Sequence, residues 1–411
     1  MHDIGKYAKA LAPVLAIFAA ASDPAAAQTW SSPQVVGSVP YLTGGAVATN
    51  GNTSAVVFAA GVATDNMFEV QAVVRSGGTW GPRVALSPQF QFAENFTVAV
   101  APNGDVLAAW RYDATMATDS GVAQVAFYTA GHWSAPLTIS TAGLNAGIPS
   151  IAFDGQSQAT VVWEQNTTST TCVLKALRGD AGHGFGAAQT ISSTCYRYVD
   201  LAVNSIGQAV AVQGAPGITT GPVVAISRDA NGTWAAPVTL AASVYRQRQP
   251  QVGLGNEGTA VVVWLTRGGV SYATRSNGNW SAAAPLPGVL AGRAGGVSGV
   301  AVDGNGNAVA TFTLTSGTPG VFATYRPVSG TWQAPVQLPA GPVPLKASPA
   351  GTFIVGSGST VATRLAGSSI WKSTSFSNDS IVDVAAGPAV AIVTLAGVAP
   401  DSIAVSTAAT P

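Results

Sequence analysis

One short element recurs along the sequence in four closely similar copies: GGTWGPRVAL at residues 77–86, GHWSAPLTI at 131–139, NGTWAAPVTL at 231–240 and SGTWQAPVQL at 329–338. Each copy contains a tryptophan, a proline two or three residues later, and a closing leucine or isoleucine. Weaker copies bring the number of aromatic markers to eight, separated by 39 to 53 residues. The markers are Trp30, Trp80, Trp133, Phe185, Trp234, Trp280, Trp332 and Trp371. A regular period of this length is typical of repeat architectures.

Short apolar runs bounded by turn residues return in the same order between markers. In the fifth unit they are QVGLG (251–255), TAVVVW (259–264) and VSYATR (270–275). Three further tryptophans, Trp110, Trp163 and Trp264, each follow a marker by 30 residues, so we expect them to pack between adjacent units. Four short strands per unit, with middle strands apolar on both faces, predict an all-β propeller.

The two ends of the chain favour eight blades. A marker strand at Trp30 begins the mature chain, and three apolar runs after Trp371 lack a marker strand of their own. We therefore expect the N-terminal strand to pair with the C-terminal three strands and close the ring. A seven-bladed ring with an irregular tail is the alternative.

The composition excludes several classes of protein. The 411 residues include 18 Lys+Arg and 18 Asp+Glu, a net charge of zero, which argues against nucleic acid as a partner. With 47% hydrophobic residues, 47 Gly and 25 Pro, the chain can bury a core but is interrupted too often for a coiled coil or an all-helical fold.

The N-terminus resembles a secretory signal. Lys6 and Lys9 precede a mostly apolar stretch at residues 10–21, and AAA at 25–27 offers a cleavage site. We expect residues 1–27 to be removed and residues 28–411 to form a single propeller domain that is secreted or periplasmic. The mature chain contains no apolar run long enough to span a membrane.

The two cysteines suit an oxidising compartment. Cys172 and Cys195 flank the turn GDAGHG at residues 179–184, so a hairpin would bring them together. We expect a disulfide that links two strands, with free thiols as the alternative.

The stretch SRDANGTW (residues 227–234) resembles the Asp-box repeat of bacterial neuraminidases, Ser-x-Asp-x-Gly-x-Thr-Trp, with Asn231 at the glycine position. Asparagine tolerates the positive φ that we expect there. The resemblance implies a propeller in which the motif lies between third and fourth strands, away from any catalytic face. Sialidases of that family use an arginine triad, a Tyr/Glu pair and an acidic residue, and the sequence contains no motif that matches them. Six recurring arginines end the third strand of their units and are assigned to the same hairpin side, and not to catalysis: Arg75, Arg178, Arg228, Arg275, Arg326 and Arg364.

Four loops on the opposite face concentrate arginine, tyrosine and acidic residues in a chain with few charges. Such side chains could hydrogen-bond a sugar or a carboxylate, and Asp113 with Glu164 could act as acid and base if the fold brings them together. Ordinary solvated loop residues are the alternative. The candidate ligand-binding residues are Arg111, Tyr112, Asp113, Glu164, Tyr196, Arg197, Tyr198, Tyr245, Arg246 and Arg248.

No cofactor or metal site is expected. His132 and His183 occupy equivalent turns, and the Gly/Asn-rich turns lack the carboxylates that calcium needs. The sequence thus predicts a soluble, monomeric binding module for a glycan or a surface protein. A sialidase-like glycosidase and a purely structural envelope protein are the alternatives.

Overall fold

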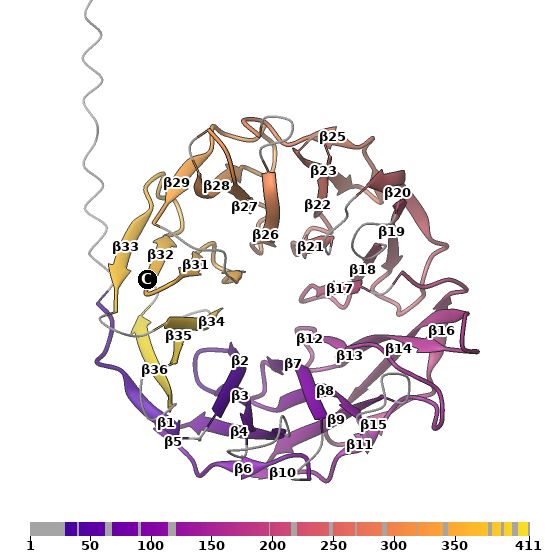
Figure 1. Ribbon diagram of the computed structural model, residues 1–411, viewed down its shortest axis with the longest axis vertical. Coiled ribbons are helices and arrows are strands. Elements are labelled where there is room, and N and C mark those ends of the chain that lie inside the picture. The colour runs from indigo at the N-terminus through magenta and orange to yellow at the C-terminus, as the bar shows by residue number, and fades with distance from the viewer. Residues whose placement is uncertain are drawn as a thin grey trace, which may run out of the picture.

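A computed structural model describes residues 29–38, 41–61, 68–88, 92–113, 121–196, 198–214, 220–245, 250–267, 269–289, 294–317, 319–339, 344–376, 380–387, 390–396 and 402–409. Within these residues the strands form eight antiparallel sheets arranged as a ring (Figure 1). The described residues contain no helix, and hence no apolar helix that could cross a membrane. The prediction of an all-β propeller is confirmed.

Seven of the sheets are meanders, and in all eight the strands run antiparallel outward from a first strand that lies nearest the axis (Figure 1). The first strands are β2 (Tyr41–Thr49), β7 (Phe92–Val100), β12 (Ser150–Phe153), β17 (Tyr198–Val203), β21 (Gln251–Leu254), β26 (Ala294–Val302), β30 (Leu345–Ala347) and β34 (Ser380–Ala386). The second strands are β3 (Ser54–Gly61), β8 (Val106–Asp113), β13 (Ala159–Asn166), β18 (Ala209–Gly214), β22 (Ala260–Thr266), β27 (Ala308–Leu314), β31 (Phe353–Ser357) and β35 (Val390–Ala396).

The outer half of each sheet holds the third strand and the marker strand. The third strands are β4 (Phe68–Ser76), β9 (Val122–Thr129), β14 (Cys172–Asp180), β19 (Thr220–Arg228), β23 (Gly269–Ser276), β28 (Gly320–Arg326), β32 (Thr360–Arg364) and β36 (Ser402–Ala409). The outer strands are β1 (Gln34–Ser38), β5 (Thr79–Trp80) with β6 (Val84–Ala85), β10 (His132–Trp133) with β11 (Leu137–Thr138), β15 (Gly184–Phe185) with β16 (Gln189–Ser192), β20 (Val238–Tyr245), β24 (Asn279–Trp280) with β25 (Ala284–Pro285), β29 (Val336–Leu338) and β33 (Lys372–Ser375).

One sheet combines both ends of the chain. Strand β1 pairs antiparallel with β36, with Gln34 opposite Val405 and Ser38 opposite Ser402. Trp30 forms a further bridge to Ala408. Residues more than 360 positions apart in sequence thereby share one sheet.

Apolar side chains fill the spaces between neighbouring sheets, as the unbroken apolar runs predict. The three tryptophans of the second strands, Trp110, Trp163 and Trp264, are at most 1% exposed. Trp264, for example, packs against Val212 and Val223 of the preceding sheet. The expectation that these tryptophans pack between units is confirmed, and each buries an area whose loss would cost about 3–5 kcal/mol.

The turns that join first and second strands bond to one another around the axis; we call them the turn belt. In six of these turns the residue two positions before the second strand has positive φ, and it is usually glycine, because an L side chain is strained there. These residues are Gly104, Ser157, Gly207, Gly258, Gly306 and Gly351, and the shorter first turn has its positive φ at Gly51.

Hydrogen bonds join neighbouring turns of the belt. Asn50 Nδ2 donates to the Ala101 carbonyl (2.7 Å), Asn204 Nδ2 donates to that of Gly255 (3.0 Å), and the Gly304 amide donates to that of Pro349 (3.0 Å). The partners lie 45 to 51 residues apart, since the same contact repeats from sheet to sheet. A cavity of about 500 Å³ opens at this end and takes lining residues from all eight sheets.

Candidate functional site

At the end of the ring opposite the turn belt, a cavity of about 170 Å³ lies among three neighbouring sheets and the start of β21. We call it the acidic cavity, because Glu164 and Asp200 both line it. The other lining residues are Thr97, Ile148, Pro149, Ser150, Tyr198, Val199, Pro250 and Gln251. Of the ten candidate residues from the sequence, Glu164 and Tyr198 belong to this lining.

Glu164 reaches the cavity from the second strand of its sheet. It directly follows the buried Trp163, so strand alternation turns its side chain to the opposite face. Glu164 is only 6% exposed, and the Gly147 amide donates to its carbonyl oxygen (2.8 Å). A Cβ at position 147 would lie 3.2 Å from Glu164 Cβ, so glycine leaves the room that this side chain occupies.

Asp200 approaches from the innermost strand β17. Its Oδ2 accepts a hydrogen bond from the Val252 amide of the next sheet (2.8 Å). Burial raises the pKa of Asp200, although the hydrogen bond and the charge of Lys346 act in the opposite direction. The sequence analysis missed Asp200 as a site residue, although an internal signal was available: Asp383 occupies the same position of its own strand and bonds the Val47 amide in the same way (2.8 Å).

This arrangement suits recognition of hydroxyl groups or acid–base chemistry. A carboxyl group with a raised pKa keeps its proton to higher pH and can then donate a hydrogen bond, whereas an ionised carboxylate only accepts. Tyr198 adds a phenol beside the two acids. The structure therefore brings Glu164 together with Asp200, where the sequence analysis paired it with Asp113.

Arg111 bonds to the segment that leads into the neighbouring sheet, where Ala146 bridges Gln165 of β13. Arg111 Nε donates to the Ala146 carbonyl (3.1 Å), its Nη2 donates to Asn145 Oδ1 (3.0 Å), and Asp113 lies 3.8 Å away. Burial, with a smaller effect of Asp113, raises the pKa of Tyr112. None of the three lines the acidic cavity.

The remaining candidates are spread over the same end of the ring. Tyr196 packs partly buried against the core between its sheet and the next, and the backbone of Tyr245 pairs with Thr220 at the edge of β20. Arg197, Arg246 and Arg248 lie outside the described residues.

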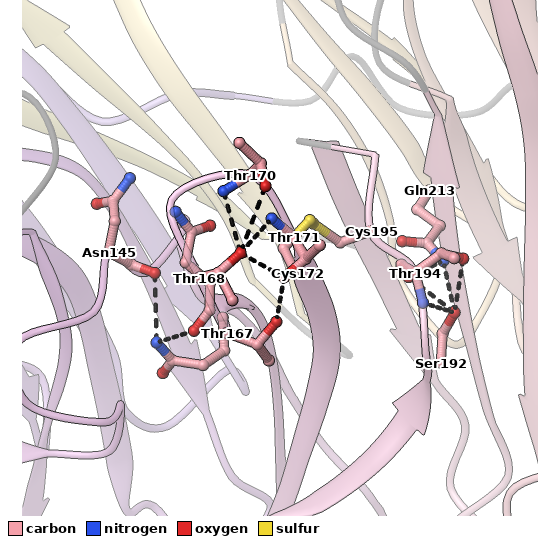
Figure 2. The surroundings of a disulfide bond; sticks show 12 residues. Asn145, Thr167, Thr168, Thr170, Thr171, Cys172, Ser192, Thr194, Cys195 and Gln213 are labelled. Carbon is pink, nitrogen blue, oxygen red and sulfur yellow. Dashed lines mark hydrogen bonds between the residues drawn. A yellow bond between two sulfur atoms is a disulfide. The ribbon is translucent and has the colours of Figure 1, made fainter.

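A disulfide stabilises the rim beside this cavity. Cys172 and Cys195 are bonded, with their Cα atoms 5.4 Å apart, and the strands β14 and β16 that they flank pair as a hairpin (Figure 2). The loop just before Cys172 is closed by its own threonines: the Thr167 amide donates to the Thr171 carbonyl (2.8 Å), and the amide of Thr171 donates to Thr168 Oγ1 (3.0 Å). These contacts fix the loop that follows the strand of Glu164.

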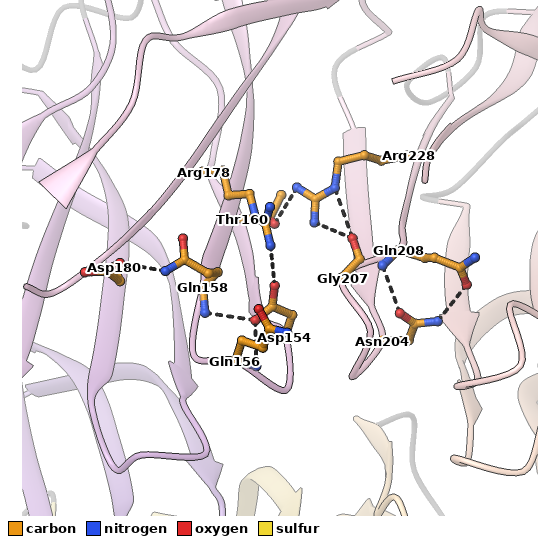
Figure 3. A network of polar contacts seen from close by, with 10 residues as sticks. All are labelled: Asp154, Gln156, Gln158, Thr160, Arg178, Asp180, Asn204, Gly207, Gln208 and Arg228. Atoms are coloured by element: carbon orange, nitrogen blue, oxygen red, sulfur yellow. Dashed lines mark hydrogen bonds and ion pairs between the residues drawn. The ribbon is translucent and has the colours of Figure 1, made fainter. Parts of the chain in front are cut away.

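At the other end, the recurring arginines hold the turn belt in place. Arg178 forms an ion pair with Asp154 (2.7 Å), and Arg228 donates to Thr160 Oγ1 (2.8 Å) and to the Gly207 carbonyl (2.9 Å) (Figure 3). These contacts agree with a structural role for the two arginines.

The Asp-box-like turn differs from the expected geometry in one detail. Asp229 Oδ1 accepts the Thr233 amide (2.8 Å), which closes the turn as the motif implies. The residue with positive φ is Gly232 and not Asn231, so the expectation for Asn231 is wrong. The turn places its strained position one residue later, where glycine carries no penalty.

Histidine and carboxylate side chains do not gather into a metal-binding group anywhere in the described part of the chain. His183, which is exposed, contacts Asp180 (3.0 Å) in its own turn. Hydrogen bonds from this turn and from Gln158 lower the pKa of Asp180 to about 2.

Comparison with known proteins identifies the fold. No protein-family model and no curated protein matches the sequence. The structure is similar to the polysaccharide lyase Uly1, with a TM-score of 0.51, 11% identity, and coverage of 92% of this chain and 91% of that one. It is also similar to the Hadza microbial sialidase Hz136 (TM-score 0.46, 12% identity, 84% and 74% coverage). A mutant of NanB sialidase from Streptococcus pneumoniae gives a TM-score of 0.45 at 11% identity, with 92% and 70% coverage. At such identities the similarity shows the β-propeller fold alone.

Proposed function

We propose that this protein is an exported binding module that recognises a glycan, or a glycan-bearing surface partner, at the acidic cavity. The observation that carries the proposal is the convergence of Glu164, Tyr198 and Asp200 on one cavity at the end of the ring away from the turn belt. Carboxyl and phenol groups on rigid strands are suited to hydroxyl-rich ligands, because each donor and acceptor is held in a fixed direction.

The test is a titration of the mature protein with 3′-sialyllactose and lactose, followed by calorimetry. We expect saturable binding that Glu164→Gln and Tyr198→Phe each weaken by roughly tenfold, as loss of one buried hydrogen bond predicts. Glu257→Gln is the matched control, since Glu257 is an exposed acid in the turn belt. Binding that is equally strong in all three variants would refute the acidic cavity as the site.

A sialidase-like glycosidase is the second candidate, favoured by the raised pKa of Asp200 beside a second carboxyl group. A protonated acid and an ionised carboxylate are the pair that glycoside hydrolysis needs. Turnover of a fluorogenic sialoside that is lost on changing Arg197 or Arg246 would establish the enzyme. Saturable binding without turnover supports the module, and absence of both leaves a structural role.

Export is part of the proposal, with removal of residues 1–27, which lie outside the described residues. The disulfide supports an oxidising destination. The mass of the protein purified from the periplasm or the medium should correspond to residues 28–411, with two hydrogens fewer than the reduced chain. Recovery of the full-length reduced chain from the cytoplasm would contradict export.

We also propose that the ring functions as eight blades closed by β1, with seven blades and a tail as the alternative. The pairing of β1 with β36 and the cavity lined from eight sheets support this count. Deleting residues 28–38 should then lower the melting temperature markedly, because it exposes the edge of β36. A seven-bladed ring would tolerate the deletion.

A further inference from the structure

A second cavity, of about 360 Å³, lies on the outside of the ring between the sheet of β14 and the sheet of β19. Its volume falls within the roughly 300–1,000 Å³ of ordinary ligand pockets. We call it the arginine cavity, because its lining contains Arg178 and Arg228 and no carboxylate. The other lining residues are Ala176, Leu177, Gly186, Ala187, Gln189, Asn231, Gly232 and Trp234.

The two guanidinium groups are close enough to repel one another. Burial, together with the charge of Arg178, lowers the pKa of Arg228 to about 10, against the opposing effect of Asp154 and Asp229. Arg228 is 2% exposed and fully committed to Thr160 and Gly207, whereas the side chain of Arg178 remains 36% exposed. Arg178 is therefore the cation that a ligand can reach; its Nη2 pairs with the buried Asp154 (2.7 Å), which does not line the cavity.

The cavity exists where the repeat departs from its pattern. After the marker aromatic, other copies carry a proline and then an exposed aliphatic residue, as with Leu137, Val238 and Val336. This copy has Gly186 directly after the marker, where the other three have Ser134, Ala235 and Gln333, and it has Ala188 in place of the proline and the polar Gln189 at the aliphatic position. Gly186 and Gln189 line the cavity, so the absent side chain of Gly186 leaves space and Gln189 supplies a hydrogen-bonding group to the wall.

Trp234 contributes a flat apolar indole ring to the wall of the arginine cavity. Its ring centroid lies 5.4 Å from Cζ of the buried Arg228, a cation–π contact that supports the indole from behind. The indole together with the exposed part of Arg178 suits a molecule with a C–H face and a charged group.

We infer that the arginine cavity binds a sugar carrying an anionic group, carboxylate or sulfate, with the anion at Arg178, a hydroxyl at Gln189 and the ring against Trp234. A guanidinium N–H group donates to either oxyanion, and at Arg178 this group is Nη1, because Nη2 pairs with Asp154 and Nε is buried. This site is separate from the acidic cavity: Thr160, which bonds to Arg228, and Glu164 occupy opposite halves of β13, about 13 Å apart at the usual strand rise.

The experiment is a calorimetric titration of the mature protein with sodium D-glucuronate, D-glucose 6-sulfate, D-glucose and sodium sulfate. We expect glucuronate or glucose 6-sulfate to bind saturably, with affinity falling as salt is added, and neutral glucose not to bind. Arg178→Gln and Gln189→Leu should each weaken binding by roughly tenfold. Gln189→Leu restores the residue type of the other copies, so it keeps the fold even if Arg178→Gln does not.

Two control variants separate this site from the rest of the molecule. Arg275→Gln changes the equivalent arginine of another sheet, and Glu257→Gln changes an exposed acid of the turn belt; neither should alter glucuronate or glucose 6-sulfate affinity. No binding of either anionic sugar at about 10 mM, well above a weak dissociation constant of ~1 mM, would overturn the inference. Inorganic sulfate binding as tightly as glucose 6-sulfate would overturn the sugar contact at Trp234, and unchanged affinity in both Arg178→Gln and Gln189→Leu would overturn the location.

Discussion

The two ends of the ring use polar residues in opposite ways. In the turn belt, Asn50 and Asn204 occupy the same position of their turns and donate to the next turn, and backbone amides such as those of Gly155, Asn256 and Gly304 join other neighbouring turns. At the acidic cavity the residues break the repeat: the position after the second-strand tryptophan is Arg111, Glu164 or Leu265. Polar chemistry that repeats therefore holds the ring together, while polar chemistry that departs from the repeat marks the candidate sites.

Removing the disulfide should produce the largest effect on the acidic-cavity end. With a sequence separation of 23 between the cysteines, the double variant Cys172→Ala/Cys195→Ala should lose about 3 kcal/mol of unfolding free energy, because the unfolded chain gains freedom. Urea denaturation measures this loss. An unchanged midpoint of urea denaturation would mean that the threonine-closed loop and the β14–β16 pairing stabilise this part of the ring without the disulfide.

Asn204→Ala should cost about 2 kcal/mol at the turn belt. The substitution removes the bond to the Gly255 carbonyl (3.0 Å) and the acceptor for the Gln208 amide (2.9 Å), leaving buried groups unpaired. Asn279→Ala, in an exposed hairpin, is the control and should change stability by less than about 0.5 kcal/mol. Equal losses of stability in the two variants would contradict the structural role that we assign to the turn belt.

Asp383→Ala should cost about 1–2 kcal/mol, since it removes the acceptor for the Val47 amide between the last and first sheets. The negative charge of Asp383, in contrast, lowers the stability of the folded state, because the carboxylate is buried. Burial raises its pKa, so its contribution to stability is complete below the ordinary pKa of 3.8 and is lost as the pH rises through the raised value.

Asp383→Asn keeps an acceptor and removes this titration. We expect its unfolding free energy to fall less than that of the wild type as the pH rises from about 3.8, with Asp200 and Lys346 still present. Denaturation across pH measures the difference. Parallel pH profiles for the two proteins would show that Asp383 does not titrate during unfolding.

Ser157→Gly should have the smallest effect, below about 1 kcal/mol. Glycine relieves the positive φ of 61°, but the hydroxyl that accepts the Asn103 amide (3.1 Å) is lost. The melting temperature of the variant measures the net effect of the relieved strain and the lost hydrogen bond. A stabilised variant would show that strain outweighs this single bond of the belt, and a strongly destabilised one would show the reverse.

Part of the candidate site was predictable from sequence. Glu164 and Tyr198 stood out because charged and aromatic loop residues are rare in this chain, and both line the acidic cavity. Arg111 and Asp113 stood out for the same reason. However, Arg111 bonds to Asn145 and Ala146, Asp113 lies 3.8 Å from Arg111, and neither residue lines the acidic cavity. Composition cannot distinguish the two outcomes, because the direction of a side chain depends on its neighbours in the next sheet.

Sequence alone determined the repeat, its strands, the tryptophans between sheets and the closeness of the two cysteines, because these follow from local periodicity and turn chemistry. Tertiary structure decided the pairing of Glu164 with Asp200 and the meeting of Arg178 with Arg228. Each pair joins residues of adjacent sheets, and only the packing angle between sheets sets which side chains share a cavity.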